Sequence, residues 1–158
     1  MIHIVLYEPE IPQNTGNISR TCAVTGCALH IIKPIGFEIS DRTLKRAGLD
    51  YWDKLEVYYY ESYSEFTEKH GGKDMYYFSQ RGKRLYSDIP LSEEIFLIFG
   101  KESVGLPREL LLENSESTVR IPMLPDRRCL NLSNSVAIAA YDLLRRTEFQ
   151  GFLMEGEL

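Results

Sequence analysis

The fold of this chain is decided by the stretch Ile121-Pro-Met-Leu-Pro-Asp-Arg-Arg-Cys-Leu-Asn-Leu-Ser-Asn-Ser-Val136, where an apolar segment passes into a long helical pattern. Pro122 and Pro125 prevent the segment from continuing as a strand or helix, because proline has no N–H to donate. One polar residue is enough to cap a helix start, where its side chain accepts a hydrogen bond from a free N–H group. Here four fall within five positions: Asn131, Ser133, Asn134 and Ser135. Taken alone, the stretch fits equally a polar loop with a helix cap and a binding loop for a small polar ligand.

Away from this stretch, β-rich segments and helical patterns alternate along the chain. Strands are expected at 2–7, 28–33, 55–60, 74–79, 94–99 and 118–121. Helices are expected at 14–25 with Asn14 as cap, from Ser40 to Gly48, and at 62–70, 106–113 and 131–146. This alternation predicts an α/β fold with a mostly parallel sheet and helices on both faces. The length predicts a single domain over residues 1–158.

Composition narrows the class of protein. No apolar run is long enough to span a membrane, and Met1–Glu8 is typical of a strand rather than a signal peptide, so we expect a cytoplasmic protein. The net charge of −5 argues against a protein that coats nucleic acid non-specifically. Cys22, Cys27 and Cys129 lack the spacing of metal ligands and are expected to be reduced thiols, with no metal site.

Three unusual segments follow predicted strands, at 78–82, 99–107 and 122–135. Ligands of parallel sheets bind outside the carboxyl ends of the strands, so this shared placement favours the binding interpretation. The glycines in Phe99-Gly-Lys-Glu-Ser-Val-Gly-Leu-Pro107 do not have the spacing of a phosphate-binding loop. Gly100 is expected to let a ligand approach the backbone. Glu102 is expected either to cap a helix or to orient another residue of the site.

The chemistry available in these segments is limited. They contain no histidine and no paired carboxylates, which gives weak support to hydrolysis or metal catalysis. Amides, hydroxyls, glycines and arginines suit a neutral or cationic small molecule and an anionic partner held by arginine. A polar stripe of Asn14, Asn17 and Thr21, with Arg20 beside it, is expected on the first helix.

Three motifs resemble those of the SPOUT RNA methyltransferases. They are Asn14-Thr-Gly-Asn-Ile-Ser-Arg-Thr-Cys22, the glycine-punctuated segment 99–107, and Ile121-Pro-Met-Leu-Pro125 followed by Leu130-Asn-Leu-Ser-Asn-Ser-Val-Ala137. Their order, together with the short chain, most resembles the minimal tRNA (cytidine/uridine-34 2′-O)-methyltransferase family. Two further segments fit that pattern: Ile4-Val-Leu-Tyr-Glu-Pro-Glu-Ile-Pro12 and Arg46-Ala-Gly-Leu-Asp-Tyr51.

The resemblance implies a C-terminal deep trefoil knot, an exception to the rule that chains avoid threaded connections. It also implies S-adenosyl-L-methionine as cofactor, the tRNA anticodon stem-loop as substrate, and a homodimer whose sites are completed at the interface. The residues that would take catalytic roles are Asn14, Arg20, Glu102 and Asn131. Those that would contact the cofactor are Phe78, Gly100, Ile121, Cys129 and Leu130.

Position 129 departs from the pattern, because serine is common there in the family and cysteine is the weaker hydrogen-bonding group. The basic residues expected to contact RNA are Lys45, Arg46, Arg127 and Arg128, and further candidates are Arg81, Lys83, Arg84, Arg145 and Arg146. Two alternatives stay open: a related enzyme that methylates ribosomal RNA or another tRNA position, and an inactive knotted RNA-binding protein. The presence of all four residues with implied catalytic roles favours an enzyme.

Overall fold

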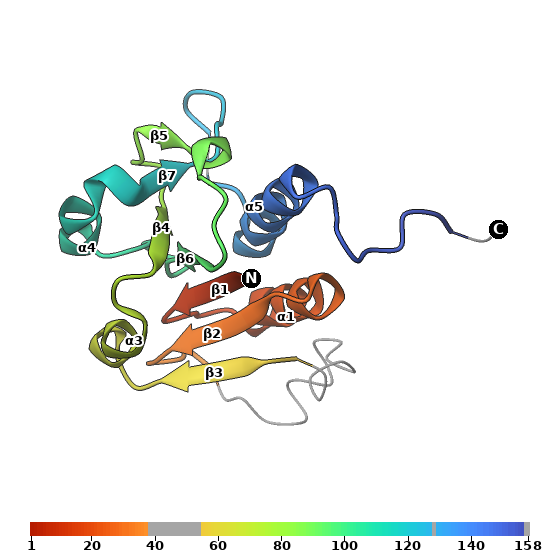
Figure 1. Cartoon of the computed structure of the whole chain (residues 1–158). Coiled ribbons are helices and arrows are strands. Elements are labelled where there is room, and N and C mark those ends of the chain that lie inside the picture. The colour runs from red at the N-terminus through yellow and green to blue at the C-terminus, as the bar shows by residue number, and fades with distance from the viewer. Residues whose placement is uncertain (38–54, 128, 157–158) are drawn as a thin grey trace.

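The computed structural model describes residues 1–37, 55–127 and 129–156. Its centre is a seven-stranded sheet in the order β3-β2-β1-β6-β4-β7-β5, with every pair of neighbours parallel (Figure 1). The strands are β1 (Ile2–Tyr7), β2 (Ala28–Ile32), β3 (Val57–Tyr60), β4 (Asp74–Phe78), β5 (Arg84–Leu85), β6 (Ile95–Phe99) and β7 (Thr118–Arg120). The predicted α/β fold with a parallel sheet is confirmed.

Helices cover both faces of this sheet, as predicted. Helices α1 (Pro12–Thr25) and α5 (Leu132–Arg146) pack on one face, and α3 (Tyr63–His70) and α4 (Arg108–Glu113) pack on the other. Short 3-10 turns, η2 (Tyr86–Asp88) and η3 (Ser115–Ser117), complete the described elements. None of the described helices has the length and apolar character needed to cross a membrane.

The two central strands, β1 and β6, contribute to both hydrophobic cores. Ile4 and Leu6 of β1 belong to the core under α1 and α5, whereas Val5 between them belongs to the core under α3 and α4. Alternate side chains of a strand point to opposite faces, so a strand covered on both faces must be apolar at nearly every position. This explains why β1 and β6 show apolar runs in the sequence rather than alternation.

Some element boundaries differ from those expected. Helix α1 begins at Pro12 instead of Asn14, with Ile11 as an N-cap that provides no side-chain bond. Proline suits the first helical position because its φ is already helical and its missing N–H would have had no partner there. Strand β5 was not predicted, since two residues carry no readable pattern. The helix expected from Ser40 to Gly48 lies outside the described residues.

The strand order places the site. β6, β4 and β7 are neighbours, and the last residues of β4 and β6, Phe78 and Phe99, pair directly. The segments that follow these three strands therefore leave the sheet at the same edge. They correspond to the three segments in which a binding site was expected.

The three histidines of the protein are joined in one row of hydrogen bonds that runs from β1 through β2 and β3 to His70 at the end of α3. Nδ1 of His3 lies 2.9 Å from Nε2 of His30, whose Nδ1 lies 2.8 Å from the hydroxyl oxygen of Tyr60. That oxygen lies 2.9 Å from Nε2 of His70. Burial lowers the pKa of His30 to about 3, assisted by His3 and His70, and burial also lowers the pKa of those two residues. Protonation of these rings is therefore less favourable in the folded protein than in the unfolded chain.

We expect the free energy of unfolding to fall as the pH drops below 6.5, the ordinary histidine pKa. The unfolded chain then takes up protons that the folded chain resists, so stability is lost between that pH and the lowered folded pKa. Replacing His30 by Gln should reduce the slope of stability against pH by up to about 1.4 kcal/mol per pH unit. Urea unfolding at several pH values between 7.5 and 5 measures this slope.

The matched control is Tyr58→Phe, because Tyr58 stacks on His30 but its hydroxyl donates to Glu56 instead. This control should keep the slope of the unaltered protein. An unchanged slope in His30→Gln would show that the buried rings do not govern the acid response.

Candidate functional site

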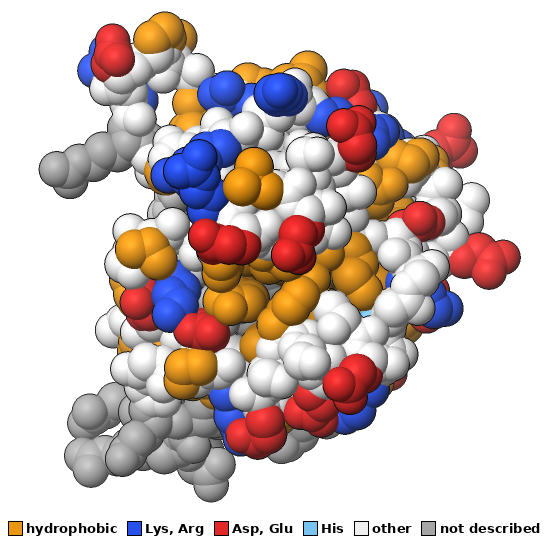
Figure 2. All heavy atoms as spheres, turned by 90° about the vertical axis from the view of Figure 1, so that its left-hand side faces the viewer, with side chains coloured by type: hydrophobic (Ala, Val, Ile, Leu, Met, Phe, Trp, Pro, Cys, Tyr) orange, Lys and Arg blue, Asp and Glu red, His pale blue; other side chains and the backbone are white. Residues whose placement is uncertain are grey.

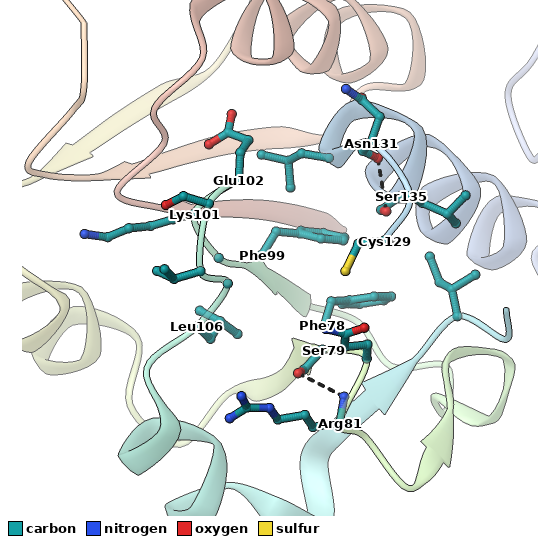
Figure 3. Close-up of a pocket in the computed structure, with 18 of the residues that line it drawn as sticks. Phe78, Ser79, Arg81, Phe99, Lys101, Glu102, Leu106, Cys129, Asn131 and Ser135 are labelled. Atoms are coloured by element: carbon teal, nitrogen blue, oxygen red, sulfur yellow. Dashed lines mark hydrogen bonds between the residues drawn. The ribbon is translucent and has the colours of Figure 1, made fainter. Parts of the chain in front are cut away.

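A cavity of about 670 Å³ opens at the edge where β4, β6 and β7 end (Figure 3). This volume is typical of pockets for small molecules. Its wall is built by the segments 78–81 and 99–106, by residues between 121 and 135, and by Ile11 and Asn14 at the start of α1. The three segments expected to bind a ligand are therefore brought together. The rings of Phe78 and Phe99 stack with centroids 4.4 Å apart, forming a flat apolar wall.

One carboxylate ties the segment after β6 to the start of α1. Oε2 of Glu102 accepts the N–H of Glu10 at 2.9 Å, and its Oε1 accepts the N–H of Ile11 at 3.2 Å. Oε1 also accepts a hydrogen bond from Nδ2 of Asn14 at 3.0 Å. A negative charge is favourable here because the helix dipole is positive at its N-terminus. Glu102 thus binds the two residues that precede α1 and orients the side chain of Asn14.

Asn14 extends this connection to α5. Its Oδ1 accepts a hydrogen bond from Nδ2 of Asn131 at 2.9 Å. Oδ1 of Asn131 accepts the N–H groups of Ser133 and Asn134 at 2.9 and 3.4 Å, which caps α5. Asn14 was expected to cap α1, and that prediction is wrong, because its amide is used between segments instead. It is 5% exposed, so these partners replace water.

A second carboxylate makes the reciprocal contact. Glu10 accepts the N–H of Ser103 at 3.0 Å and its hydroxyl at 2.9 Å. These hydrogen bonds from Ser103 hold the pKa of Glu10 below its ordinary value. Neither Glu10 nor Ser103 was singled out in the sequence, since a pairing across so many residues has no local signal.

Position 100 requires glycine because the backbone of the following hairpin packs against it. Backbone hydrogen bonds between Lys101 and Gly105 close a tight hairpin. A Cβ at Gly100 would lie 2.2 Å from the carbonyl carbon of Gly105 and from the nitrogen of Leu106. The expectation that Gly100 is glycine to admit a ligand is therefore corrected: backbone fills that space. Gly100 still lines the cavity with its main chain.

The residues expected to contact a cofactor lie in the wall of this cavity. All five residues expected to contact a cofactor line the cavity: Phe78, Gly100, Ile121, Cys129 and Leu130. Figure 3 shows the sulfur of Cys129, a free and exposed thiol, directed into the space beside Phe99 and Phe78. Residues lining the cavity that were not among these predictions include Ser79, Arg81, Lys101, Leu106 and Met123.

The residues expected to be catalytic divide into two groups. Asn14, Glu102 and Asn131 meet in the network above. Arg20 does not line the cavity and lies on the exposed side of α1. Of the residues expected to contact RNA, Arg127 is exposed in the segment before α5, whereas Lys45, Arg46 and Arg128 lie outside the described residues. Within the described ranges, no group of three or more His, Cys, Asp or Glu side chains could hold a metal ion.

Comparison with known proteins identifies similar chains. The model of the SpoU rRNA Methylase family matches residues 1–141. A curated relative from Listeria innocua, with the provisional name tRNA (cytidine(34)-2′-O)-methyltransferase, is 53% identical over 97% of this chain and 92% of its own length. A solved structure on the 2-OH methylation of C/U34 on tRNA has a TM-score of 0.88 and 43% identity, covering 95% of this chain and 98% of that one.

A more distant solved structure shares the fold. The SpoU methyltransferase AviRb from Streptomyces viridochromogenes, in complex with the cofactor AdoMet, superimposes with a TM-score of 0.80 at 20% identity. The similarity covers 95% of this chain and 58% of that one.

We expect Asn14→Ala to lower the free energy of unfolding by about 1–3 kcal/mol, because the Asn131 amide then has no acceptor and Glu102 loses a donor. Asn17→Ala, on the exposed side of the same helix, is the matched control and should stay within about 0.5 kcal/mol. Urea unfolding measures both. Equal effects of the two substitutions would contradict a structural role for the network.

Proposed function

The chain belongs to the SpoU rRNA Methylase family, and from that premise we propose that it methylates the ribose 2′-oxygen of the wobble nucleotide, cytidine or modified uridine 34, of tRNA. The observation that carries the proposal is the cavity into which all three motif segments converge. Relatives with names or titles for this reaction align over almost the whole chain. That agreement favours nucleotide 34 over ribosomal RNA or another tRNA position, and the complete network favours an enzyme over an inactive RNA-binding protein.

We propose that the cavity binds S-adenosyl-L-methionine, which supplies an electrophilic methyl group on a sulfonium. The stacked rings of Phe78 and Phe99 suit a flat apolar ring system. Gly100, Ile121 and Leu130 would add main-chain hydrogen-bonding groups at the wall. Cys129 would contribute mainly through its backbone, which makes the replacement of a common serine tolerable.

Asn14, Glu102 and Asn131 act in this proposal as positioning residues. Both carboxylate oxygens of Glu102 already accept hydrogen bonds from the protein. The amides of Asn14 and Asn131 are likewise occupied by each other and by α5. These contacts hold the cavity segments in register. Catalysis then depends largely on presenting the hydroxyl in line with the methyl group, since enforced geometry removes much of the entropic barrier.

We propose that Arg20 acts across a homodimer interface. It lies outside the cavity of its own chain. The layer formed by α1 and α5 carries exposed apolar side chains: Val24, one turn after Arg20, and Ile138 and Tyr141 on α5. A two-fold axis through this surface, termed the α1/α5 face, would bury these side chains and bring Arg20 to the partner's cavity.

In that position the guanidinium of Arg20 would orient the ribose or an adjacent phosphate and stabilise the developing alkoxide. It remains protonated, so the hydroxyl proton passes to water or to a phosphate oxygen. Arg127, exposed in the segment that lines the cavity, is proposed to contact RNA.

Three further proposals complete this account. The segment 121–146 is proposed to form the trefoil knot. Two observations support this: the loop before α5 shares the cavity wall with the segments at 78 and 99, and α5 packs against α1. Residues 1–158 form a single methyltransferase domain. The enzyme acts in the cytoplasm, where its tRNA substrate is found.

The test uses Arg20→Ala, which should abolish methyl transfer to tRNA and leave S-adenosylmethionine affinity within about twofold, because Arg20 is outside the cavity. Transfer is measured with labelled cofactor and mapped by mass spectrometry to nucleotide 34, and affinity by calorimetry. Lys69→Ala, an exposed cation on α3 at the other face of the sheet, is the control and should retain activity. Near-normal transfer by Arg20→Ala, or methylation elsewhere in the tRNA, would contradict the proposal.

The dimer is tested by co-expressing Arg20→Ala with Cys129→Trp, a variant whose added bulk closes the cavity, and isolating the mixed dimer with two different tags. Each variant should be inactive alone. If Arg20 serves the partner's cavity, the mixed dimer holds one intact site and regains about half of the normal activity. If Arg20 serves its own cavity, the mixed dimer has no intact site and stays inactive.

A further inference from the structure

A second, smaller cavity of about 300 Å³ lies against the first. Its wall includes Tyr7 and Glu8 at the end of β1, Arg81 after β4, Lys101 in the hairpin after β6, and Arg108 at the start of α4. We propose that this pocket, termed the basic cleft, binds a backbone phosphate of the RNA substrate next to the nucleotide being methylated. The inference rests on the proposed function and adds to it a specific contact with the substrate.

The charge of the basic cleft is positive although the whole chain carries −5. Arg81, Lys101 and Arg108 contribute three positive charges and Glu8 one negative charge, which leaves +2. Lys101 and Arg108 lie on the stretch from the end of β6 to the start of α4, and Arg81 follows β4, so the fold brings together cations that do not form a basic run in the chain. A concave site with one sign of charge attracts an anion more strongly than the same charges spread over a surface.

The basic cleft and the proposed cofactor cavity share a wall. Arg81, Lys101 and the hairpin residues Val104 to Leu106 line both. Figure 3 shows the charged ends of Lys101 and Arg81 extending to the same side, away from Cys129 and Asn131. A phosphate held there would therefore lie beside the cavity in which the methyl group is presented, as the phosphate flanking a methylated ribose must.

Lys101 is already held in place for this contact. Its Nζ lies 2.5 Å from Oε2 of Glu8, and the two side chains are 30% and 18% exposed. The hydrogen bond and charge of Glu8 raise the pKa of Lys101, so the ammonium stays charged. Arg81 and Arg108 can each offer a pair of parallel N–H donors to phosphate oxygens, the geometry in which arginine binds phosphate best. Among the described residues that line the cleft, Glu8 carries the negative charge that opposes an anion.

The surrounding surface favours a local contact over a broad basic patch. Figure 2 views the side of the molecule toward which β1, β2 and β3 point, and shows a hollow with hydrophobic side chains near its middle. Both acidic and basic side chains surround that hollow. RNA lying across this surface would meet carboxylates as well as cations, so its phosphate needs a defined subsite.

The test is the salt dependence of binding to an unmodified tRNA transcript with cytidine at position 34, measured by filter binding over a series of potassium chloride concentrations. Each phosphate contact in a single-stranded loop contributes about 0.7 to the slope of log K against log salt. Arg81→Gln and Arg108→Gln should each weaken binding several-fold and lower the slope by about that amount. Lys69→Gln, an exposed cation on α3, is the control and should keep the slope.

Glu8→Gln should change RNA affinity in the opposite direction. Removing this carboxylate frees Lys101 for the phosphate, so RNA binding should become several-fold tighter. A merely structural role for the Glu8–Lys101 pair predicts weaker binding or none. Calorimetry with S-adenosylmethionine should show unchanged affinity in Arg108→Gln, because Arg108 lines the basic cleft and not the cofactor cavity.

Unchanged salt slopes in both arginine variants would overturn the basic cleft as a phosphate subsite. So would a loss of cofactor affinity in Arg108→Gln equal to its loss of RNA affinity, because the cleft would then hold the carboxylate of the cofactor. If the unaltered protein methylates tRNA while the variants bind RNA as it does, the proposed function stands and only this subsite fails. If the unaltered protein binds no tRNA, both proposals fail.

Discussion

The Glu102 carboxylate is the contact on which the site depends. It accepts hydrogen bonds from Glu10, Ile11 and Asn14, residues about 90 positions earlier in the chain. An ionised carboxylate only accepts, so the NH₂ group of Asn14 must face it and the oxygen of Asn14 must face Asn131. The oxygen of Asn131 is then left for the free N–H groups of α5. One charged group thereby determines the orientation of two amides and the position of two helix starts.

The hydrogen-bonding groups of the site are thus mostly committed to the protein itself. The segments that form the cavity lie beyond the ends of the strands, where side-chain hydrogen bonds between segments take the place of the ladder bonds of the sheet. The buried histidine chain at the other face shows a different solution, in which neutral rings bond to one another with the charge excluded. Charged side chains such as Arg81 and Lys101 lie at the cavity edge, where water, a cofactor or RNA can reach them.

Much of the fold could be predicted from local pattern. Alternating strand and helix signals predicted the parallel sheet, and polar residues after β4, β6 and β7 predicted where a ligand would bind. The structural roles of individual residues were harder to predict from the sequence. Gly100 was explained by a ligand, but the hairpin backbone of Gly105 and Leu106 fills its space. Asn14 was assigned to a helix cap, although its partners are Glu102 and Asn131. Periodicity reports which face of an element is buried, and it contains no information on which distant side chains will meet.

The sharpest test of the cavity is a crystal structure of the protein with S-adenosylhomocysteine. The adenosyl group should lie in the cavity against the Phe78 and Phe99 rings, with hydrogen bonds to main-chain groups at Gly100, Ile121 and Leu130, and the Glu102–Asn14–Asn131 bonds should be unchanged. A ligand bound outside this cavity, or a network that breaks to admit it, would contradict the claim that these three residues hold a preformed cofactor site.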